Sequence, residues 1–286
     1  MNESTPPLPA GTLMQGRRGL ITGVANDRSL AWAIARALSA QGAELAFTYQ
    51  VEQIAKRVIP LAETLGSDKC FHVDLTDDNG VADMISALAA DWGKIDFIVH
   101  GAAWASKEDL RGRYLDTTRE NFSRSLVVSC HTFTSLIAAA EPHLGDDASA
   151  LTLTYYGSER VMPHYNVMGV AKAALEASVK YLAADLGGRG VRVNALSAGP
   201  VKTLAASAIG DFRYILKWNE YNAPLRRNVT REQVGMAGLY LLSPLSAGVT
   251  GEVHHVDCGY HTVGMLAVDA ADKVRDLLGE LARENK

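Results

Sequence analysis

Short apolar runs alternate with longer amphipathic stretches along most of this 286-residue chain. The short runs are rich in β-branched and aromatic side chains, which is typical of buried parallel strands, and the longer stretches carry apolar residues at helical spacing. This alternation predicts consecutive βαβ units. We expect the strands at Gly19–Thr22, Glu44–Tyr49, Cys70–Asp74, Asp96–His100, Ala150–Tyr155, Val191–Ser197 and Glu252–Val256.

The order of these elements predicts an α/β fold. It is a Rossmann-type doubly wound parallel sheet of about seven strands, with helices on both faces, in a single domain. Right-handed crossovers cover both faces, so the ligand crevice lies at the carboxyl ends of the strands. A helix expected at Ser29–Ala40 shows the pattern, because Leu30, Ile34 and Leu38 share one stripe and Ser29 is suited to cap its start.

The chain is expected to divide into three parts. Residues 1–11 are expected to be a flexible tail, without the basic start and apolar run of a secretory signal. Residues 12–265 form the Rossmann-type domain, in which segment 200–231 interrupts the alternation with helix-prone pieces, either as a mobile lid or as ordinary surface helices. Residues 266–286 form a C-terminal amphipathic helix that packs on the body or on a partner subunit. Its apolar stripe consists of Val274, Leu277, Leu278 and Leu281.

Composition removes several classes of function. The formal net charge of -4 is of the wrong sign for binding nucleic acid through bulk electrostatics. The chain has no run of about 18 apolar residues, the length that a membrane-spanning helix needs, so we expect a cytoplasmic protein. The three cysteines are widely spaced, and His254 and His255 are adjacent in a strand, where neighbouring side chains face opposite ways. We therefore expect neither a disulfide framework nor a metal site.

The first expected strand ends in a turn suited to a dinucleotide. Gly23 closes this strand, and a helix begins within a few residues, so backbone N–H groups and the positive helix end would face a pyrophosphate. The G-x-G-x-x-G pattern is absent, since Asn26 and Ser29 occupy positions where glycines would stand. A second loop of small residues, Gly101–Ala103, follows the fourth strand. The alternative is that both loops simply pack tightly.

The end of the second strand bears on the choice of nucleotide. An acidic residue there would meet the ribose of NAD, and a neighbouring arginine would hold the 2′-phosphate of NADP. The sequence offers Gln50 instead, followed by Glu52, which would repel a phosphate. We expect NADH rather than NADPH, with Asp74 and Leu75 beside the adenine.

Tyr165 and Lys172 are the strongest candidates for chemistry. They are seven positions apart, which is roughly 20° short of two helical turns and places both on one helix face. A lysine beside a phenol stabilises the phenolate and so lowers the pKa of the tyrosine from its reference value of about 10. The alternative is an ordinary pair of amphipathic surface side chains.

The context of this pair resembles a known family. A tyrosine and a lysine after the fifth strand, followed by Val193–Pro200, resemble the short-chain dehydrogenase/reductase superfamily. Most members carry lysine four residues after tyrosine, where this chain has Gly169. The spacing Tyr-x9-Tyr-x6-Lys, formed by Tyr155, Tyr165 and Lys172, instead resembles the divergent enoyl-acyl-carrier-protein reductases. Three residues depart from these relatives, which commonly carry serine, phenylalanine and glycine at the positions of Gly101, Trp104 and Cys258.

This resemblance implies an NADH-dependent reductase of the trans-2 double bond in enoyl thioesters on acyl carrier protein, in fatty acid biosynthesis. It implies that Tyr165 donates to the developing oxyanion, that Lys172 orients the nicotinamide ribose and that Tyr155 lines the acyl pocket. A homotetramer is implied as well. The implied cofactor contacts are Gly23, Ser29, Leu30, Gln50, Asp74, Leu75, Ala103, Lys172, Val201 and Thr203, and the implied substrate contacts are Ala105, Tyr155, Tyr165, Phe212 and Ile215.

Two other functions stay open on the sequence. One is a carbonyl reductase or alcohol dehydrogenase of the same superfamily, with Tyr165 as general acid. The other is a dinucleotide sensor without catalysis, since a fold does not fix a function. A basic face for an acidic carrier protein is also expected, made by Lys202, Arg213, Lys217, Arg226, Arg227 and Arg231.

Overall fold

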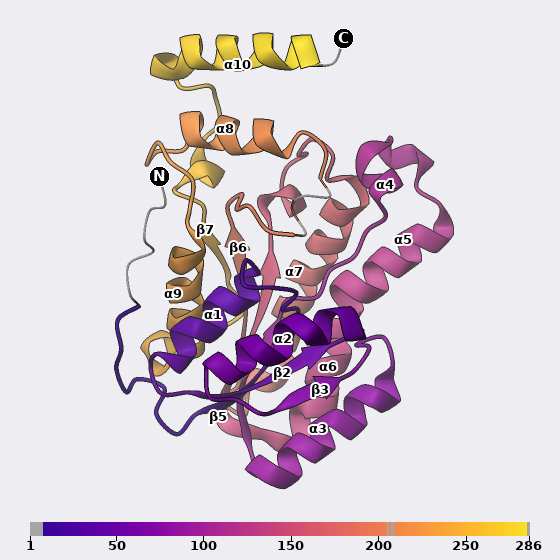
Figure 1. Cartoon of the computed structure of the whole chain (residues 1–286), viewed down its shortest axis with the longest axis vertical. Coiled ribbons are helices and arrows are strands. Elements are labelled where there is room, and N and C mark those ends of the chain that lie inside the picture. Colours follow the sequence, from indigo (N-terminus) through magenta and orange to yellow (C-terminus); the bar gives the residue numbers. More distant parts are fainter. Residues whose placement is uncertain (1–7, 205, 207–208, 285–286) are drawn as a thin grey trace.

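The computed structural model describes residues 8–204, 206 and 209–284. Within them seven parallel strands form one sheet in the order β3-β2-β1-β4-β5-β6-β7 (Figure 1). The order reverses direction beside β1, as in doubly wound sheets. The strands are β1 (Arg18–Ile21), β2 (Glu44–Tyr49), β3 (Cys70–His72), β4 (Ile95–His100), β5 (Leu144–Thr154), β6 (Arg192–Ala198) and β7 (Val253–Val256).

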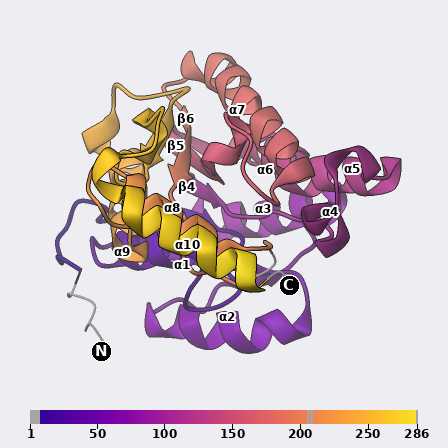
Figure 2. The ribbon, with the colours of Figure 1, turned by 90° about the horizontal axis from the view of Figure 1, so that it is seen from above.

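Helices cover both faces of this sheet (Figure 2). One core contains side chains of α3 (Asp78–Trp92), α6 (Thr132–Ala140) and α7 (Asn166–Gly187). The other contains side chains of α1 (Leu30–Ser39), α2 (Glu52–Thr64) and α9 (Arg231–Leu242). In β4 the side chain of Ile98 enters the first core, and those of Phe97 and Val99 enter the second. Because successive strand residues face opposite ways, the sheet needs apolar residues at nearly every position. The expected single-domain α/β fold is confirmed.

The helices that follow are numbered in chain order. Between α5 and α6 the chain makes one π-helical turn, Val127–His131, and a short 3₁₀ turn, Tyr156–Ser158, follows β5. The helices are α1 (Leu30–Ser39), α2 (Glu52–Thr64), α3 (Asp78–Trp92), α4 (Lys107–Arg111), α5 (Arg119–Leu126), α6 (Thr132–Ala140), α7 (Asn166–Gly187), α8 (Phe212–Asn222), α9 (Arg231–Leu242) and α10 (Ala271–Glu284).

Two strands differ from the expected boundaries by more than one residue at an end. β3 ends at His72, because Asp74 turns away and accepts hydrogen bonds from the backbone and hydroxyl of Thr76. β5 begins at Leu144, well before the expected Ala150, and its pairing with β4 is irregular near that end. The residues that follow Leu144 are polar, so the pattern of apolar runs did not predict this part of the strand.

The start of α1 is where the sequence predicts it, but the role of Ser29 is different. α1 begins at Leu30, and the Ser29 side chain makes no cap to the helix backbone. Its Oγ instead accepts from the backbone N–H groups of Ala25 and Asn26, at 3.0 and 3.2 Å. Ser29 therefore stabilises the turn that precedes the helix.

The first and last segments that the structure describes both contact the body of the protein. The expected N-terminal tail lies outside the described residues as far as residue 7, but the N–H of Gly11 already donates to the carbonyl of Ala40 at 3.0 Å. At the other end α10 lies across α8 (Figure 1), with Val274 and Leu277 buried. Of the two arrangements left open for this helix, packing on the body is the one observed. Across residues 8–204, 206 and 209–284 there is no helix long and apolar enough to cross a membrane.

Candidate active site

A cleft of about 460 Å³ opens at the carboxyl ends of β1 to β4. Val201 and Lys172 do not line it. Ala102 of the expected loop Gly101–Ala103 does, and so do Trp104, Arg124 and Val128, which the sequence analysis did not assign to the cofactor. A crevice at this point of a doubly wound sheet is where a dinucleotide binds. Eight expected cofactor contacts line the cleft: Gly23, Ser29, Leu30, Gln50, Asp74, Leu75, Ala103 and Thr203.

Gly23 provides the tight turn in the floor of this cleft. Its φ of +80° lies in the left-handed region that favours glycine. A Cβ at this position would lie 2.3 Å from the carbonyl carbon of Gly101, so the two loops touch backbone to backbone. This close approach leaves the cleft shallow enough for a pyrophosphate to reach the N-terminus of α1.

Gln50 and Asp74 join the ends of β2 and β3. The amide Nε2 of Gln50 donates to Oδ2 of Asp74 at 2.7 Å. Burial alone would raise the pKa of Asp74, but hydrogen bonds from Thr76 and Gln50 and the charge of Arg124 together lower it. The carboxylate that β2 lacks is therefore provided by the neighbouring strand, which fits the ribose or adenine of a dinucleotide.

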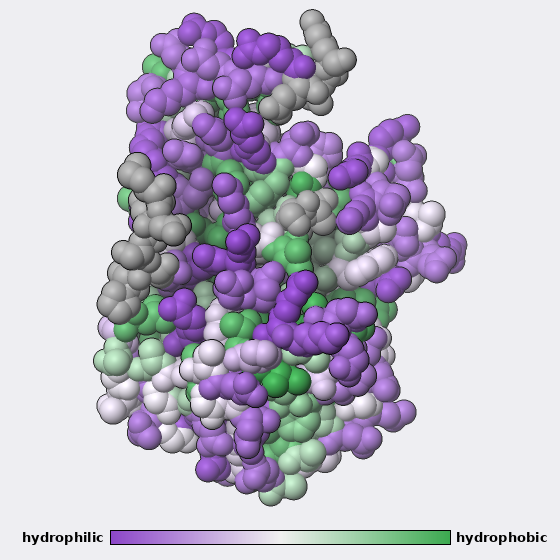
Figure 3. Space-filling view, viewed as in Figure 1, coloured by the Kyte–Doolittle hydropathy of each residue, from purple (hydrophilic) through white to green (hydrophobic). Residues whose placement is uncertain are grey.

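Tyr155 and Tyr165 meet in a small apolar cluster beside the cleft. Their ring centroids are 5.0 Å apart with the planes at 75°, an edge-to-face contact. Tyr165 is 7% exposed and packs with Leu110 and Met168, and Ala105 also borders this cluster. Phe212 and Ile215 lie apart, on α8. Apolar surface gathers in the hollow below α8 (Figure 3).

The expected effect on the tyrosine pKa is wrong. Burial, with smaller contributions from Tyr155 and Glu176, raises the pKa of Tyr165 above its usual value. Burial likewise raises the pKa of Tyr155, with Tyr260 and Asp257 adding to the shift. Desolvation outweighs any stabilisation of a phenolate by the lysine. Both phenols therefore stay protonated near neutral pH and act as hydrogen-bond donors.

Lys172 is buried and faces the cleft wall. Its Nζ donates to the carbonyl of Leu153 at 2.8 Å, and Leu153 lines the cleft. Burial lowers the pKa of Lys172 to about 8, although the nearby Cys130 and Glu176 favour the charged form. Tyr165 is the residue immediately before α7, so only the lysine is within the expected shared helix. The ammonium is charged at neutral pH and adjoins the cleft.

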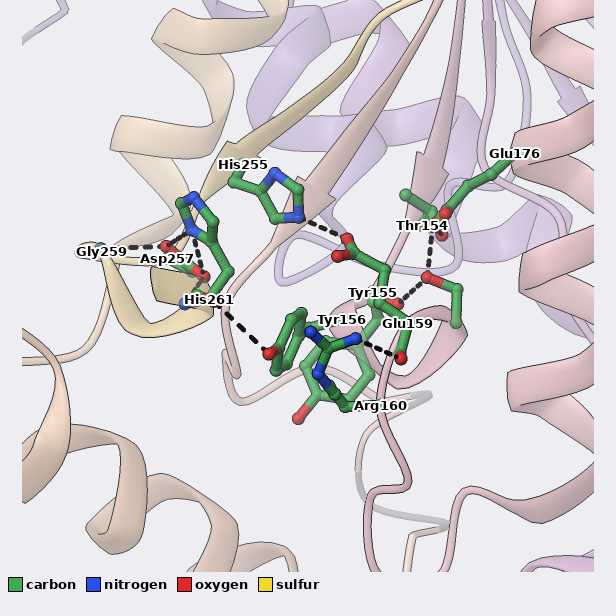
Figure 4. Close-up of polar contacts among 11 residues, drawn as sticks. Thr154, Tyr155, Tyr156, Glu159, Arg160, Glu176, His255, Asp257, Gly259 and His261 are labelled. Carbon is green, nitrogen blue, oxygen red and sulfur yellow. Dashed lines mark hydrogen bonds and ion pairs between the residues drawn. The ribbon is translucent and has the colours of Figure 1, made fainter. Parts of the chain in front are cut away.

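Glu176 is a buried residue that sequence reasoning missed. It follows Lys172 by one helical turn, a spacing that places the two side chains on one face. Its Oε1 accepts from the hydroxyls of Thr154 and Ser158, each at 2.5 Å (Figure 4). These two residues flank Tyr155, so the carboxylate fixes the turn that carries this tyrosine.

A second polar network adjoins Tyr155 (Figure 4). Nε2 of His255 lies 2.6 Å from Oε1 of Glu159, and its ring stacks on that of His261 at 4.0 Å. Nδ1 of His261 in turn lies 3.0 Å from Oδ1 of Asp257. Each imidazole has its own carboxylate partner. Among the described residues no group of three or more His, Cys, Asp or Glu side chains is arranged to hold a metal.

A protein-family model matches most of this chain. Residues 23–261 match the family model described as Enoyl-(Acyl carrier protein) reductase. The chain belongs to this family. Its backbone fits the assignment at Cys258, whose φ of +61° is the conformation that favours the glycine expected in relatives.

Individual members of the family are similar over nearly their whole length. The chain is 64% identical to enoyl-[acyl-carrier-protein] reductase [NADH] 1 of Rhizobium meliloti, covering 92% of this chain and 97% of the relative. It is 54% identical to the Rickettsia typhi reductase [NADH] FabI, covering 88% and 97%. The crystal structure of the Anaplasma phagocytophilum reductase in complex with NAD has a TM-score of 0.87 at 56% identity, covering 92% of this chain and 98% of that one.

Gly169 distinguishes this family from the commoner short-chain pattern in structural terms. A Cβ on Gly169 would lie 2.6 Å from the carbonyl oxygen of Gly157, and a Cβ on Gly157 would lie 2.3 Å from Cδ1 of Tyr165. The ring of Tyr165 thus rests on a backbone that has no room for side chains. A lysine four residues after the tyrosine does not fit here, which argues against the carbonyl reductase alternative.

We expect Gly169→Ala to lower both stability and activity. The added methyl meets a backbone oxygen that cannot rotate away, and overpacking of this kind costs about 1–3 kcal/mol. Differential scanning calorimetry and the rate of NADH oxidation measure the two effects. Gly187→Ala on the same helix is the matched control, because nothing lies within 4 Å of a Cβ there. Equal behaviour of the two variants would contradict the packing argument.

Proposed function

We propose that this protein is an NADH-dependent enoyl-acyl-carrier-protein reductase that reduces the trans-2 double bond of enoyl thioesters. The observation that carries the proposal is the packing of the buried Tyr165 with the partly buried Tyr155 in an apolar cluster beside the cleft whose wall Lys172 contacts. The relatives named as [NADH] reductases and the NAD complex of a similar structure support the same nucleotide.

NADH, when bound in the cleft, supplies the hydride that adds to the double bond. Negative charge then develops on the thioester oxygen and must be stabilised. The Tyr165 phenol is protonated and buried, so it donates a hydrogen bond to this oxygen from a site that excludes water. Such a donor typically contributes about 3–4 kcal/mol in the transition state.

Lys172 holds the ribose beside the reacting ring. Its ammonium lies within hydrogen-bonding reach of the Leu153 carbonyl and keeps further N–H groups for the sugar hydroxyls. Its positive charge also favours the anionic transition state. Tyr155 supplies an aromatic wall for the acyl chain, and Ala105 borders the same cluster. Phe212 and Ile215, on α8, cover the substrate from above.

The expected basic docking face is partly engaged within the chain. Arg226 pairs with Asp269 at 2.8 Å and Arg213 with Glu280 at 3.6 Å, both on the C-terminal segment. A carrier protein would compete with these carboxylates for the two arginines. We propose that docking uses this face, with rate constants for carrier-linked substrate that fall as salt rises. Salt-independent kinetics would contradict it.

We also propose a homotetramer that acts in the cytoplasm. The outer face of α7 leaves Val170 37% and Tyr181 76% exposed, and the adjoining π turn leaves Val127 41% exposed. Exposed apolar groups at neighbouring positions are typical of subunit contacts. Light scattering coupled to size-exclusion chromatography measures the assembly state, and a monomer would contradict the proposal.

The function is tested with two thioesters. We expect the purified protein to oxidise NADH with crotonyl thioesters and to leave acetoacetyl thioesters unreduced, because the site stabilises an oxyanion conjugated with the double bond. Absorbance at the reduced-nicotinamide band reports both reactions. The reverse preference would identify a carbonyl reductase instead, and tight NADH binding without either reaction would identify a dinucleotide sensor.

A further inference from the structure

Arg124 and Trp104 form a stacked pair at the edge of the dinucleotide cleft. The guanidinium carbon lies 4.1 Å from the centroid of the Trp104 ring, close enough for a strong cation–π contact. Both residues line the cleft. Among the described lining residues Arg124 is the only one with a basic side chain. The mechanism above uses neither residue.

The pair is held in place by the backbone around it. The N–H of Trp104 donates to Oγ of Ser129 at 2.9 Å, and the Ser129 hydroxyl also lies 3.2 Å from the Trp104 carbonyl. Ser129 is fully buried in the π-helical turn that directly follows α5, the helix that carries Arg124. A π turn inserted in a helix is frequent at functional sites. The loop that contains Trp104 and the helical segment that contains Arg124 are therefore joined by the hydrogen bonds of Ser129.

The strand order decides which half of a dinucleotide reaches this pair. The pyrophosphate belongs at Gly23, after β1, and the reacting ring belongs near Lys172 and β5. The adenosine half must then extend the other way, towards the ends of β2 and β3. Arg124 lines the same cleft as Asp74, Leu75 and Thr76, which follow β3, and its charge acts on the Asp74 carboxylate, so it belongs to the adenosine side.

We propose that Arg124, which lies over Trp104 and lines the same cleft as Asp74, recognises the adenine ring of the dinucleotide. Adenine presents an amine donor beside ring nitrogens that accept. The Asp74 carboxylate can accept from the amine, and the Arg124 guanidinium can donate to a ring nitrogen or stack on the π face. One acceptor and one donor that line the same cleft match this edge. The inference rests on the proposed function only in that the cleft binds NADH.

The proposal predicts a loss of affinity confined to the adenine half. We expect Arg124→Gln to weaken NADH binding about tenfold, since an exposed arginine that donates a hydrogen bond to the bound adenine and stacks on it contributes on this scale. Isothermal titration calorimetry with NADH, 5′-AMP and reduced nicotinamide mononucleotide measures it directly. The variant should weaken NADH and 5′-AMP alike and leave the mononucleotide, which lacks adenine, within about twofold of the unmodified protein.

Arg119→Gln is the matched control, because Arg119 is an exposed arginine of the same helix that does not line the cleft. Unchanged NADH affinity in Arg124→Gln would overturn the proposal, and so would an equal loss for NADH and the mononucleotide. Arg124 is exposed, and an unchanged melting temperature checks that the variant is folded. Binding is measured without turnover, so a protein that binds NADH through Arg124 but reduces no enoyl thioester would disprove the proposed function alone.

Discussion

Tyr165→Phe should reduce turnover of an enoyl thioester by about a hundredfold, the typical effect of removing one donor to an oxyanion. The phenylalanine keeps the ring that packs on Gly157 and against Tyr155, so only the hydroxyl is lost. The NADH dissociation constant should stay within about twofold, since the hydroxyl is assigned to the substrate. Stopped-flow rates and NADH titration separate the two quantities.

The control for this experiment is Tyr181→Phe. Tyr181 lies on α7 as well but is 76% exposed, far from the buried cluster. Phenylalanine keeps the ring of Tyr181 that we assign to the subunit contact, so this substitution should leave the rate unchanged. A Tyr165→Phe variant with undiminished turnover would remove the phenol from the mechanism. A variant that also lost NADH binding would show that the hydroxyl acts on the nucleotide.

Lys172→Met should lower kcat/KM by at least about a hundredfold, through both weaker NADH binding and lost electrostatic stabilisation. Methionine fills much of the same buried space without a charge, so folding should be retained. The unmodified enzyme should also lose activity as the pH rises through about 8, because burial lowers the pKa of Lys172 to about 8 and the amine becomes neutral above it.

The pH dependence distinguishes the lysine from the tyrosine. The pKa of Tyr165 is raised, so its phenol stays protonated over the whole neutral and mildly alkaline range and contributes no decline there. A pH profile of kcat/KM for Lys172→Met should therefore show no loss near pH 8. If the decline persisted in the variant, another group would be responsible for it.

The parts of the fold that follow from local pattern were predictable from the sequence. The apolar strands and the turn at Gly23 were placed correctly, because fully buried strands need continuous apolar side chains and a tight turn needs a positive φ. Contacts between elements that are distant in the sequence could not be predicted from it. The Oγ bonds of Ser29, the early start of β5 and the pairing of Gln50 with Asp74 depend on where neighbouring segments lie.

The candidate site, too, could be predicted from the sequence only in part. Spacing placed Tyr165 and Lys172 on one face, and only the resemblance to the reductase family singled out Tyr155, Tyr165 and Lys172 as a set. The expectation that the lysine lowers the tyrosine pKa was wrong, because burial raises it. Glu176 and Arg124 carried no motif. Glu176 accepts from a hydroxyl that β5 brings to it. Arg124 lines the cleft at the point where the loop after β4 places Trp104 against it.

The C-terminal helix has a practical consequence for work on this enzyme. The family match ends at residue 261, so α10 lies beyond the matched region. Glu280 of α10 pairs with Arg213 of α8, and Asp269, just before α10, pairs with Arg226. A purification tag attached after this helix would be carried directly above α8. Rates obtained with carrier-linked acyl groups should therefore be taken from protein tagged at the opposite end, or from protein whose tag has been cleaved.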